Sequence, residues 1–225
     1  MTATLETSAQ GVYRLHHEGA PSGSERWRLA RSAQGWLAEG EQEWTAPFPY
    51  PNTQRWRAVL SKGWRVLALD VEWMVGERRL RATHRAEGEQ WTGRVEVAGE
   101  GREQQGNYPY SAQVEFGSPL FDTFTLLGRG FGPGTDEEYP LLSIGPPMMA
   151  VTPGRQRCRF LERGEVEGPS GPLEAWRWRI TRPDRDPAES YSFWSDREGI
   201  VLQSFEREGE KPWMRLVEYE RFPGE

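Results

Sequence analysis

Residues 173–181 carry the pattern that most constrains the fold, because apolar and polar side chains alternate there with a period of two. One face of an extended chain would carry Trp176, Trp178 and Ile180, and the other face Arg177, Arg179 and Thr181. Successive side chains of a strand point to opposite sides of a sheet, so this segment predicts a strand with one buried face.

The same alternation recurs along almost the whole chain, whereas long 3.6-residue periodicity is hard to find. We therefore expect strands at residues 11–17, 25–31, 36–44, 54–61, 64–75, 78–86, 90–98, 111–116, 141–144, 156–163, 173–181, 191–195, 200–207 and 213–221. Short glycine-containing turns separate most of these segments, and links this short join antiparallel neighbours. The sequence thus predicts an all-β, mainly antiparallel fold: a curved meander sheet or a half-open β-barrel.

The alternation breaks between residues 117 and 154. Ser118 and Pro119 offer a capping residue and a proline at the first helical position. The apolar positions that follow favour a helix over residues 120–127, so we expect one or two short helices here. The rest of the segment reads as a lid-like connection with its own apolar side chains, inside a single domain that spans residues 1–225.

Tryptophan is the most informative residue type, since the chain has 11 tryptophans although only 36% of its residues are hydrophobic. Burial must therefore depend on a few large side chains. Most of the indoles are expected in the core. The alternative is that some of them line a concave sheet face that binds an apolar ligand or a sugar.

The net charge of −6 argues against nucleic acid as a partner, because a general nucleic-acid binder needs a basic face. Arginine strongly outnumbers lysine, which occurs only as Lys62 and Lys211. A GC-rich coding bias explains this preference, and bidentate recognition of anions is the other interpretation.

Three features bear on the compartment. Cys158 is the only cysteine, so no disulfide can form within the chain, and a buried strand position is expected for it. The most apolar stretch, residues 64–75, is interrupted by charged residues, so no transmembrane segment is predicted. Residues 1–10 lack a basic and then apolar leader, and we expect a cytoplasmic protein.

The inventory for catalysis is thin. His16, His17 and His84 are the histidines; the first two are adjacent and would point to opposite faces of a strand, which is poor geometry for a shared metal ion. There is no Gly-x-Ser-x-Gly elbow. We therefore predict no metal, no cofactor and no catalytic residue.

Two segments in the last third of the chain resemble a known family. Residues 171–177 read Gly-Pro-Leu-Glu-Ala-Trp-Arg, and residues 191–203 form an aromatic strand, an Asp-containing glycine turn and an apolar strand that returns. This arrangement resembles the final strands of bacterial domains of unknown function with a curved, LolA-like antiparallel sheet. The resemblance covers about a quarter of the chain and implies a half-barrel whose concave side, covered by a helix or loop, holds a lipid or glycolipid.

The leading hypothesis is a noncatalytic binding protein for a hydrophobic small molecule or lipid, held by burial on a concave sheet face. The expected ligand-binding residues are aromatic or methionine side chains from the middle segment and the later strands: Phe121, Phe124, Tyr139, Met148, Met149, Trp176, Trp178 and Trp194.

Two alternatives stay open. The first is a hydrolase or isomerase that acts on a sugar or a small apolar substrate through carboxylates such as Asp70, Glu72 or Asp122. The second is a homo-oligomeric interaction protein that pairs through exposed strand edges or aromatic patches.

Overall fold

The computed structural model describes residues 6–185, 190–206 and 210–222. These residues form a 15-stranded sheet and one α-helix. The elements are β1 (Glu6–His17), β2 (Ala20–Ser32), β3 (Gly35–Trp44), β4 (Asn52–Ser61), β5 (Val66–Val75), β6 (Arg78–Glu87), β7 (Gln90–Val97), β8 (Glu100–Asn107), β9 (Gln113–Glu115), α1 (Pro119–Arg129), β10 (Asp136–Gly145), β11 (Ala150–Gly168), β12 (Gly171–Thr181), β13 (Tyr191–Ser195), β14 (Val201–Phe205) and β15 (Met214–Arg221).

The strand order confirms the predicted antiparallel meander. It runs β8-β7-β6-β5-β4-β3-β2-β1-β15-β14-β13-β12-β11-β10-β9, so each half of the chain folds as consecutive hairpins, and β1 and β15 join the halves at the centre. The pairing of β9 with β10 is parallel, whereas the other strand pairs are antiparallel. The alternation at residues 173–181 lies within β12, as expected.

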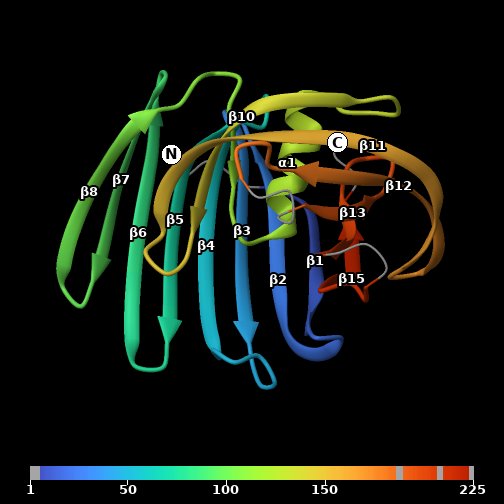
Figure 1. Ribbon diagram of the computed structural model, residues 1–225, viewed down its shortest axis with the longest axis horizontal. Coiled ribbons are helices and arrows are strands. Elements are labelled where there is room, and N and C mark those ends of the chain that lie inside the picture. Colours follow the sequence, from blue (N-terminus) through green and yellow to red (C-terminus); the bar gives the residue numbers. More distant parts are fainter. Residues whose placement is uncertain (1–5, 186–189, 207–209, 223–225) are drawn as a thin grey trace.

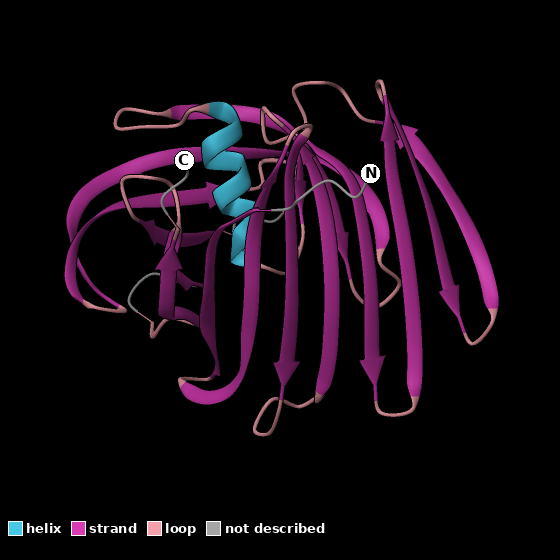
Figure 2. Cartoon of the chain, turned by 180° about the vertical axis from the view of Figure 1, so that it is seen from behind, coloured by secondary structure: helices cyan, strands magenta, loops and turns pink. Residues whose placement is uncertain are grey.

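The sheet curls back over itself. In Figure 1, β11 and β12 arch across the upper part of the molecule and run crosswise to β2–β6. Figure 2 shows the opposite side, where α1 again lies against the inner surface of the sheet. The two halves of one sheet therefore act as the two layers that a hydrophobic core requires.

The helix begins and ends where local sequence chemistry dictates. The Ser118 hydroxyl accepts a hydrogen bond from the backbone nitrogen of Leu120 at 3.3 Å, and Pro119 occupies the first helical position. Gly130 closes the other end in the left-handed region, with a φ of 62°. The predicted helix at residues 120–127 is thus confirmed within α1, as a single short helix.

The core consists of two clusters of buried side chains on either side of α1. The larger joins Phe121 and Phe124 of the helix to residues of β1–β7 and to the tip of the β10–β11 hairpin. The smaller joins Leu126 to residues of β10–β14. Because both sides of α1 are buried, each large apolar side chain contributes about 1.5–3 kcal/mol through removal from water.

One side-chain contact connects the first half of the sheet to the hairpin that crosses it. The Gln104 side chain on β8 accepts a hydrogen bond through Oε1 from the backbone nitrogen of Val151 on β11, at 2.8 Å. Next to it, Met149 at the hairpin tip is fully buried in the larger cluster, although its neighbour Met148 is 40% exposed. The hairpin tip is thereby anchored across the open side of the sheet.

Several stretches differ from the expected elements. The strand expected at residues 64–75 begins only at Val66, because Trp64 lies in a turn with a φ of 65° and stacks on Trp36 at 4.4 Å. Strand β8 was not expected, since its sequence is polar on both faces. Strands β10 and β11 extend well beyond the predicted residues 141–144 and 156–163. The last residue of the strand expected at 200–207 lies outside the described residues.

The segment at residues 117–154, expected as an irregular lid, contains α1, β10 and the start of β11. The prolines and glycines of this segment favoured a prediction of irregular structure, although most of it is helix and strand. Pro140 is tolerated in β10 because it precedes the three residues that pair with β9, so β10 has a partner only on its β11 side at that point.

Candidate functional site

A pocket of about 330 Å³ opens beside the first turns of α1, on the inner side of the curved sheet. Its volume falls at the small end of the range typical of ligand sites, about 300–1,000 Å³. The apolar part of its lining comes from α1, β9, β10 and the residue before β15: Val114, Phe116, Pro119, Phe121, Ile144, Pro146 and Trp213.

The polar part of the lining comes mainly from strands of the second half of the sheet. It consists of Glu115 on β9, Asp122 on α1, Gln156 on β11, Arg182 just after β12, and Tyr191 on β13, with smaller contributions from hydroxyl-bearing residues and Glu206. A pocket with apolar walls and a few polar groups is the usual form of a small-molecule site.

Asp122 is a carboxyl group in a strongly altered environment on the wall of this pocket. Its Oδ1 accepts a hydrogen bond from the Tyr191 hydroxyl at 2.7 Å. Burial raises the pKa of the carboxyl to about 7, although the hydrogen bond from Tyr191 acts in the opposite direction. The side chain is surrounded by protein but keeps some accessible surface, which fits a position on the pocket wall.

Glu115 and Arg182 form an ion pair on the pocket wall, with 18% and 14% of their side chains exposed. Close by in the fold, Gln156 is only 2% exposed, and its Oε1 accepts a hydrogen bond from the Tyr139 hydroxyl at 2.8 Å. The Gln156 Nε2 is buried and has no hydrogen-bond partner among the described residues. A buried amide donor without a partner is uncommon and points to a group that a ligand can satisfy.

The residues expected to bind a ligand do not gather in one place. Phe121 lines the pocket. Phe124 packs in the larger cluster, 6.1 Å from the Trp64 ring, and Met149 is buried in the same cluster. Met148 lies on the surface at the hairpin tip.

The other expected residues belong to the smaller cluster or lie at the border of one of the two clusters. Trp178 is fully buried and donates from Nε1 to the Ser195 hydroxyl at 2.9 Å. Tyr139 is buried in the same cluster and reaches the pocket only through its bond to Gln156. Trp176 packs against this smaller cluster and Trp194 against the larger one, and both are half-buried.

From the sequence, Asp122 is only one of several candidate catalytic carboxylates. Glu115, Gln156, Arg182 and Tyr191 do not stand out as site residues in the sequence. A signal was present for two of them. Asp122 interrupts the apolar run of a helix, and Gln156 shares an inward strand face with the buried Cys158, so both are polar at positions where the pattern calls for apolar residues.

The other two carboxylates proposed for catalysis lie away from this pocket. Asp70 accepts from Arg85 at 2.6 Å and Glu72 accepts from Arg79 at 2.6 Å, with 43% and 35% of the acidic side chains exposed. Both therefore belong to the cross-strand ion pairs of the outer face, which are solvated and contribute little stability each.

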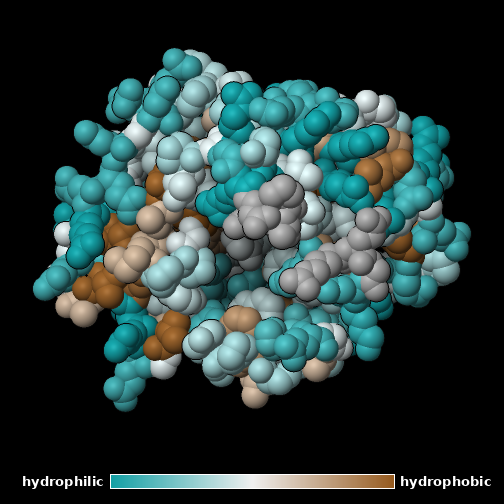
Figure 3. Space-filling model, viewed as in Figure 1, coloured by the Kyte–Doolittle hydropathy of each residue, from teal (hydrophilic) through white to brown (hydrophobic). Residues whose placement is uncertain are grey.

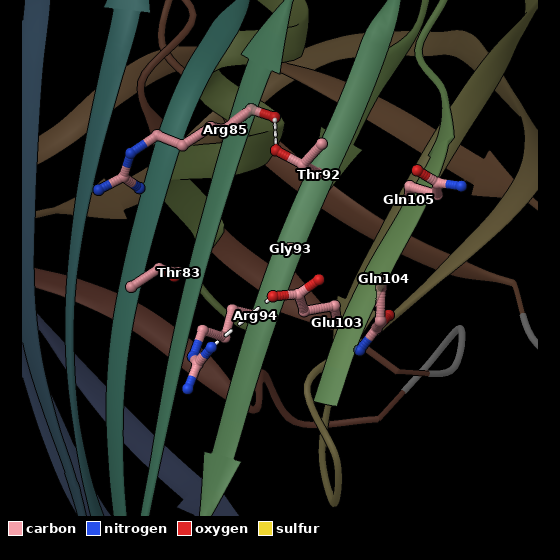
Figure 4. Close-up of a pocket in the computed structure, with 8 residues that line it drawn as sticks. All are labelled: Thr83, Arg85, Thr92, Gly93, Arg94, Glu103, Gln104 and Gln105. Atoms are coloured by element: carbon pink, nitrogen blue, oxygen red, sulfur yellow. Dashed lines mark hydrogen bonds and ion pairs between the residues drawn. The ribbon is translucent and has the colours of Figure 1, made fainter. Parts of the chain in front are cut away.

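A larger depression of about 530 Å³ lies on the outer face of β6, β7 and β8. Figure 4 shows Arg94 and Glu103 side by side over the β7 backbone, 3.7 Å apart, with Thr83, Arg85 and Thr92 around them. These side chains are exposed and polar, and Arg94 also pairs with Glu96 at 2.8 Å. A solvated surface of this kind offers little burial to a ligand, so the pocket beside α1 is the stronger candidate.

Within the described ranges, no three His, Cys, Asp or Glu side chains are grouped so that they could hold a metal ion. His84 is buried in the core, where its ring stacks on Trp91 at 5.6 Å. None of the described segments forms a helix with the length and apolar character needed for a membrane span.

Comparison with known proteins identifies the fold but not the activity. No family model matches the chain, and no curated protein matches it in sequence. A β-barrel-like protein of the domain of unknown function DUF1849 from Brucella abortus is similar in structure, with a TM-score of 0.61 and 12% identity over 97% of this chain and 99% of that one. A DUF1089 family protein from Pseudomonas aeruginosa has a TM-score of 0.55 and 15% identity, over 79% of this chain and 87% of that one.

These similarities define a class: a β-barrel-like fold shared with bacterial domains of unknown function. Because the sequence identities are only 15% and 12%, these similarities show the fold alone. The predicted curved antiparallel sheet is confirmed, whereas the finer LolA-like relationship remains part of the proposal below.

Proposed function

We propose that this protein is a noncatalytic binding protein for a hydrophobic small molecule, such as a lipid or glycolipid, and that the ligand occupies the pocket beside α1. The observation that carries the proposal is the pocket itself, with apolar walls from Phe116, Phe121 and Ile144 and a small set of polar groups. Removal of an apolar tail from water supplies the binding free energy, about 0.8 kcal/mol per buried CH₂. A curved sheet that encloses a helix also supports the proposed LolA-like relationship. We further propose that the protein acts in the cytoplasm.

Native mass spectrometry and solvent extraction of freshly purified protein test this proposal directly. We expect a bound amphiphile in the native protein and a higher melting temperature when lipids are added, because a ligand that binds only the folded state stabilises it. Absence of any bound amphiphile, together with no shift in melting temperature across a panel of lipids, would rule the proposal out.

Two substitutions locate the ligand. Ser143→Phe places a ring in the pocket from β10 and is expected to abolish binding, because the added volume competes with the ligand. Thr92→Phe adds the same ring to the outer depression and should leave binding unchanged. Equal ligand occupancy in both variants would place the ligand elsewhere on the molecule.

A second candidate is a hydrolase or isomerase, and Asp122 is the observation that favours it. A carboxyl whose pKa is raised to about 7 is suited to proton transfer near neutral pH, and Glu115 lines the same pocket. Turnover of sugar or ester substrates that disappears in Asp122→Asn would support catalysis. If a broad substrate panel gives no turnover with the native protein, the carboxyl serves binding instead.

A third candidate is a homo-oligomer that pairs through a sheet edge. Strand β8 ends the sheet, and its outer edge has no strand partner among the described residues. Figure 3 shows apolar surface over the region of β5–β7 and a second apolar patch on the right, in a face that is otherwise mainly hydrophilic. Light scattering at several dilutions decides this point, since a stable monomer argues against pairing at this edge.

A further inference from the structure

The charges on the pocket wall leave no cation uncommitted for an anionic ligand. Among the described lining residues, Glu115, Asp122 and Glu206 carry carboxyl groups, and Arg182 carries the positive charge. Arg182 already forms an ion pair with Glu115. A carboxylate or phosphate that entered this pocket would meet unfavourable electrostatic potential in a poorly solvated space, where such interactions are stronger than in water.

The hydrogen-bonding groups point to a different kind of partner. The side-chain oxygen of Gln156, Oε1, accepts a hydrogen bond from the Tyr139 hydroxyl. The side-chain nitrogen, Nε2, is buried and lacks an acceptor among the described residues. A buried donor left without a partner is energetically costly. An oxygen atom of a ligand would remove that cost.

Asp122 supplies a hydrogen-bond acceptor, which complements the donor of Gln156. Tyr191 donates to its Oδ1, and the structure gives no hydrogen bond to its second oxygen from the described residues. This oxygen can accept a hydrogen bond from a ligand hydroxyl when the carboxyl is ionised. When the carboxyl is protonated, it can donate one instead.

We infer that the pocket selects amphiphiles whose head group is uncharged and carries hydroxyl groups, in preference to fatty-acid or phosphate head groups. A hydroxyl is both a donor and an acceptor, so it matches the Gln156 Nε2 and the Asp122 carboxyl without adding charge. The inference rests on the proposed function, since it names the ligand class of the same pocket.

Three probes with the same eight-carbon chain separate the possibilities: 1-octanol, octanoate and octylamine. Each would displace a neutral fluorescent naphthylamine from the full-length protein near pH 8, where octanoate is ionised. We expect octanol to act at a concentration at least about tenfold below that of octanoate, a difference of about 1.4 kcal/mol. Octanoate as effective as octanol would overturn the inference, as would octylamine binding most tightly of the three, because the selected head would then be charged.

Failure of the inference is distinguishable from failure of the proposed function. If the naphthylamine does not bind and none of the three probes raises the melting temperature, then no apolar ligand site exists and the proposed function is wrong. If the probes bind but octanol has no advantage, the site stands and only the head-group assignment is wrong.

Variants assign the selectivity to named atoms. Asp122→Asn keeps the shape of the side chain but removes its charge, so we expect octanoate to gain affinity while octanol changes little. Gln156→Leu removes the unpaired donor and should weaken octanol binding by up to about tenfold, because one hydrogen bond is lost. Octylamine should change least in Gln156→Leu, because an ammonium group cannot accept a hydrogen bond from Nε2. A purely structural role for either residue predicts equal effects on all three probes, octylamine included.

The matched control is Glu103→Gln, which removes a carboxylate from the outer depression. It should leave the order of the three probes unchanged. Circular dichroism and thermal melting establish that each variant is folded. If Glu103→Gln shifts octanoate binding as strongly as Asp122→Asn, then overall charge rather than the pocket sets the preference, and the inference is overturned.

Discussion

The indole of Trp56 donates a hydrogen bond through Nε1 to the carboxylate of Glu25, at 3.2 Å, inside the core. Glu25 is fully buried, and its other oxygen accepts from Gln42 Nε2 at 3.2 Å. Ser118, the capping residue of α1, also hydrogen-bonds to it. A single buried carboxyl group thus connects β2, β3 and β4 to the start of the helix that forms one wall of the candidate pocket.

Glu25 should make stability depend on pH. Burial raises its pKa from 4.5 to about 7. The folded protein therefore holds a proton that the unfolded chain has lost between about pH 4.5 and 7, so this group's contribution to stability falls as pH rises through that window. Glu25→Gln should be more stable than the native protein near pH 8, by up to about 3 kcal/mol at 1.36 kcal/mol per pKa unit.

Urea unfolding of both proteins near pH 5 and near pH 8 measures this effect as the difference between variant and native protein. The difference should be larger at the higher pH. An equal difference at both pH values would mean that Glu25 is ionised throughout, with its donors compensating for burial.

His84 should act with the opposite sign. Burial lowers the pKa of its ring to about 4, and neither ring nitrogen has a hydrogen-bond partner among the described residues. The unfolded chain binds a proton between pH 6.5 and 4 that the folded protein does not, so the contribution of His84 to stability should fall as pH drops through this window. The loss reaches about 3 kcal/mol once pH is below both values.

Substitution His84→Leu should remove this contribution, so urea unfolding should show the variant gaining stability relative to the native protein as pH falls from about 7.5 to 5. Thr83→Leu, on the same strand but on the outer face, is the control and should keep the native slope. If the stability difference between His84→Leu and the native protein stays the same at both ends of this range, the acid sensitivity belongs to another group.

Gly40 is required by the close approach of Trp56. A Cβ atom on Gly40 would lie 2.4 Å from Cε2 of that indole. Gly40→Ala should therefore destabilise the protein by about 1–3 kcal/mol, the usual cost of overpacking a core. Gly106→Ala on β8 meets nothing within 4 Å and serves as the control, with urea midpoints as the measurement. Equal midpoints for the two variants would show that the indole can move aside.

Cys158 should be inert in the folded protein. The thiol is fully buried, and burial raises its pKa well above the usual range. We expect no reaction with an aromatic disulfide reagent near pH 8 until denaturant is added, because the thiolate is the reactive form. Thr92→Cys adds an exposed thiol and should react at once, with one thiol titrated. Rapid modification of the native protein would show that the region around Cys158 opens.

Much of the sheet could be predicted because its strands carry a local signal. Residues 173–181 alternate so regularly that β12 follows from them alone. Strand β8 could not be predicted in this way, since its polar residues lie at an edge where neither face is buried. The first half of β10 was hidden for another reason, because acidic residues and Pro140 are poor strand formers outside an edge.

The candidate pocket was far less predictable than the sheet. Phe121 was expected to bind a ligand, and it does line the pocket, but Trp178 and Phe124 have the same apolar character and pack into the core. Residue type does not distinguish a core position from a pocket wall, because both need apolar side chains. The distinction depends on how the two halves of the sheet meet.

The sequence by itself determined which segments become strands, where α1 begins, and which strand face turns inward, because these depend on periodicity and capping within a few residues. Only the tertiary structure decided that Tyr191 lies beside Asp122, 69 positions earlier in the chain. Their contact requires the sheet to curl until β13 faces α1, and curvature of that kind arises from packing across the whole core. The alternating strands thus supply the scaffold, and their closure around the helix creates the pocket.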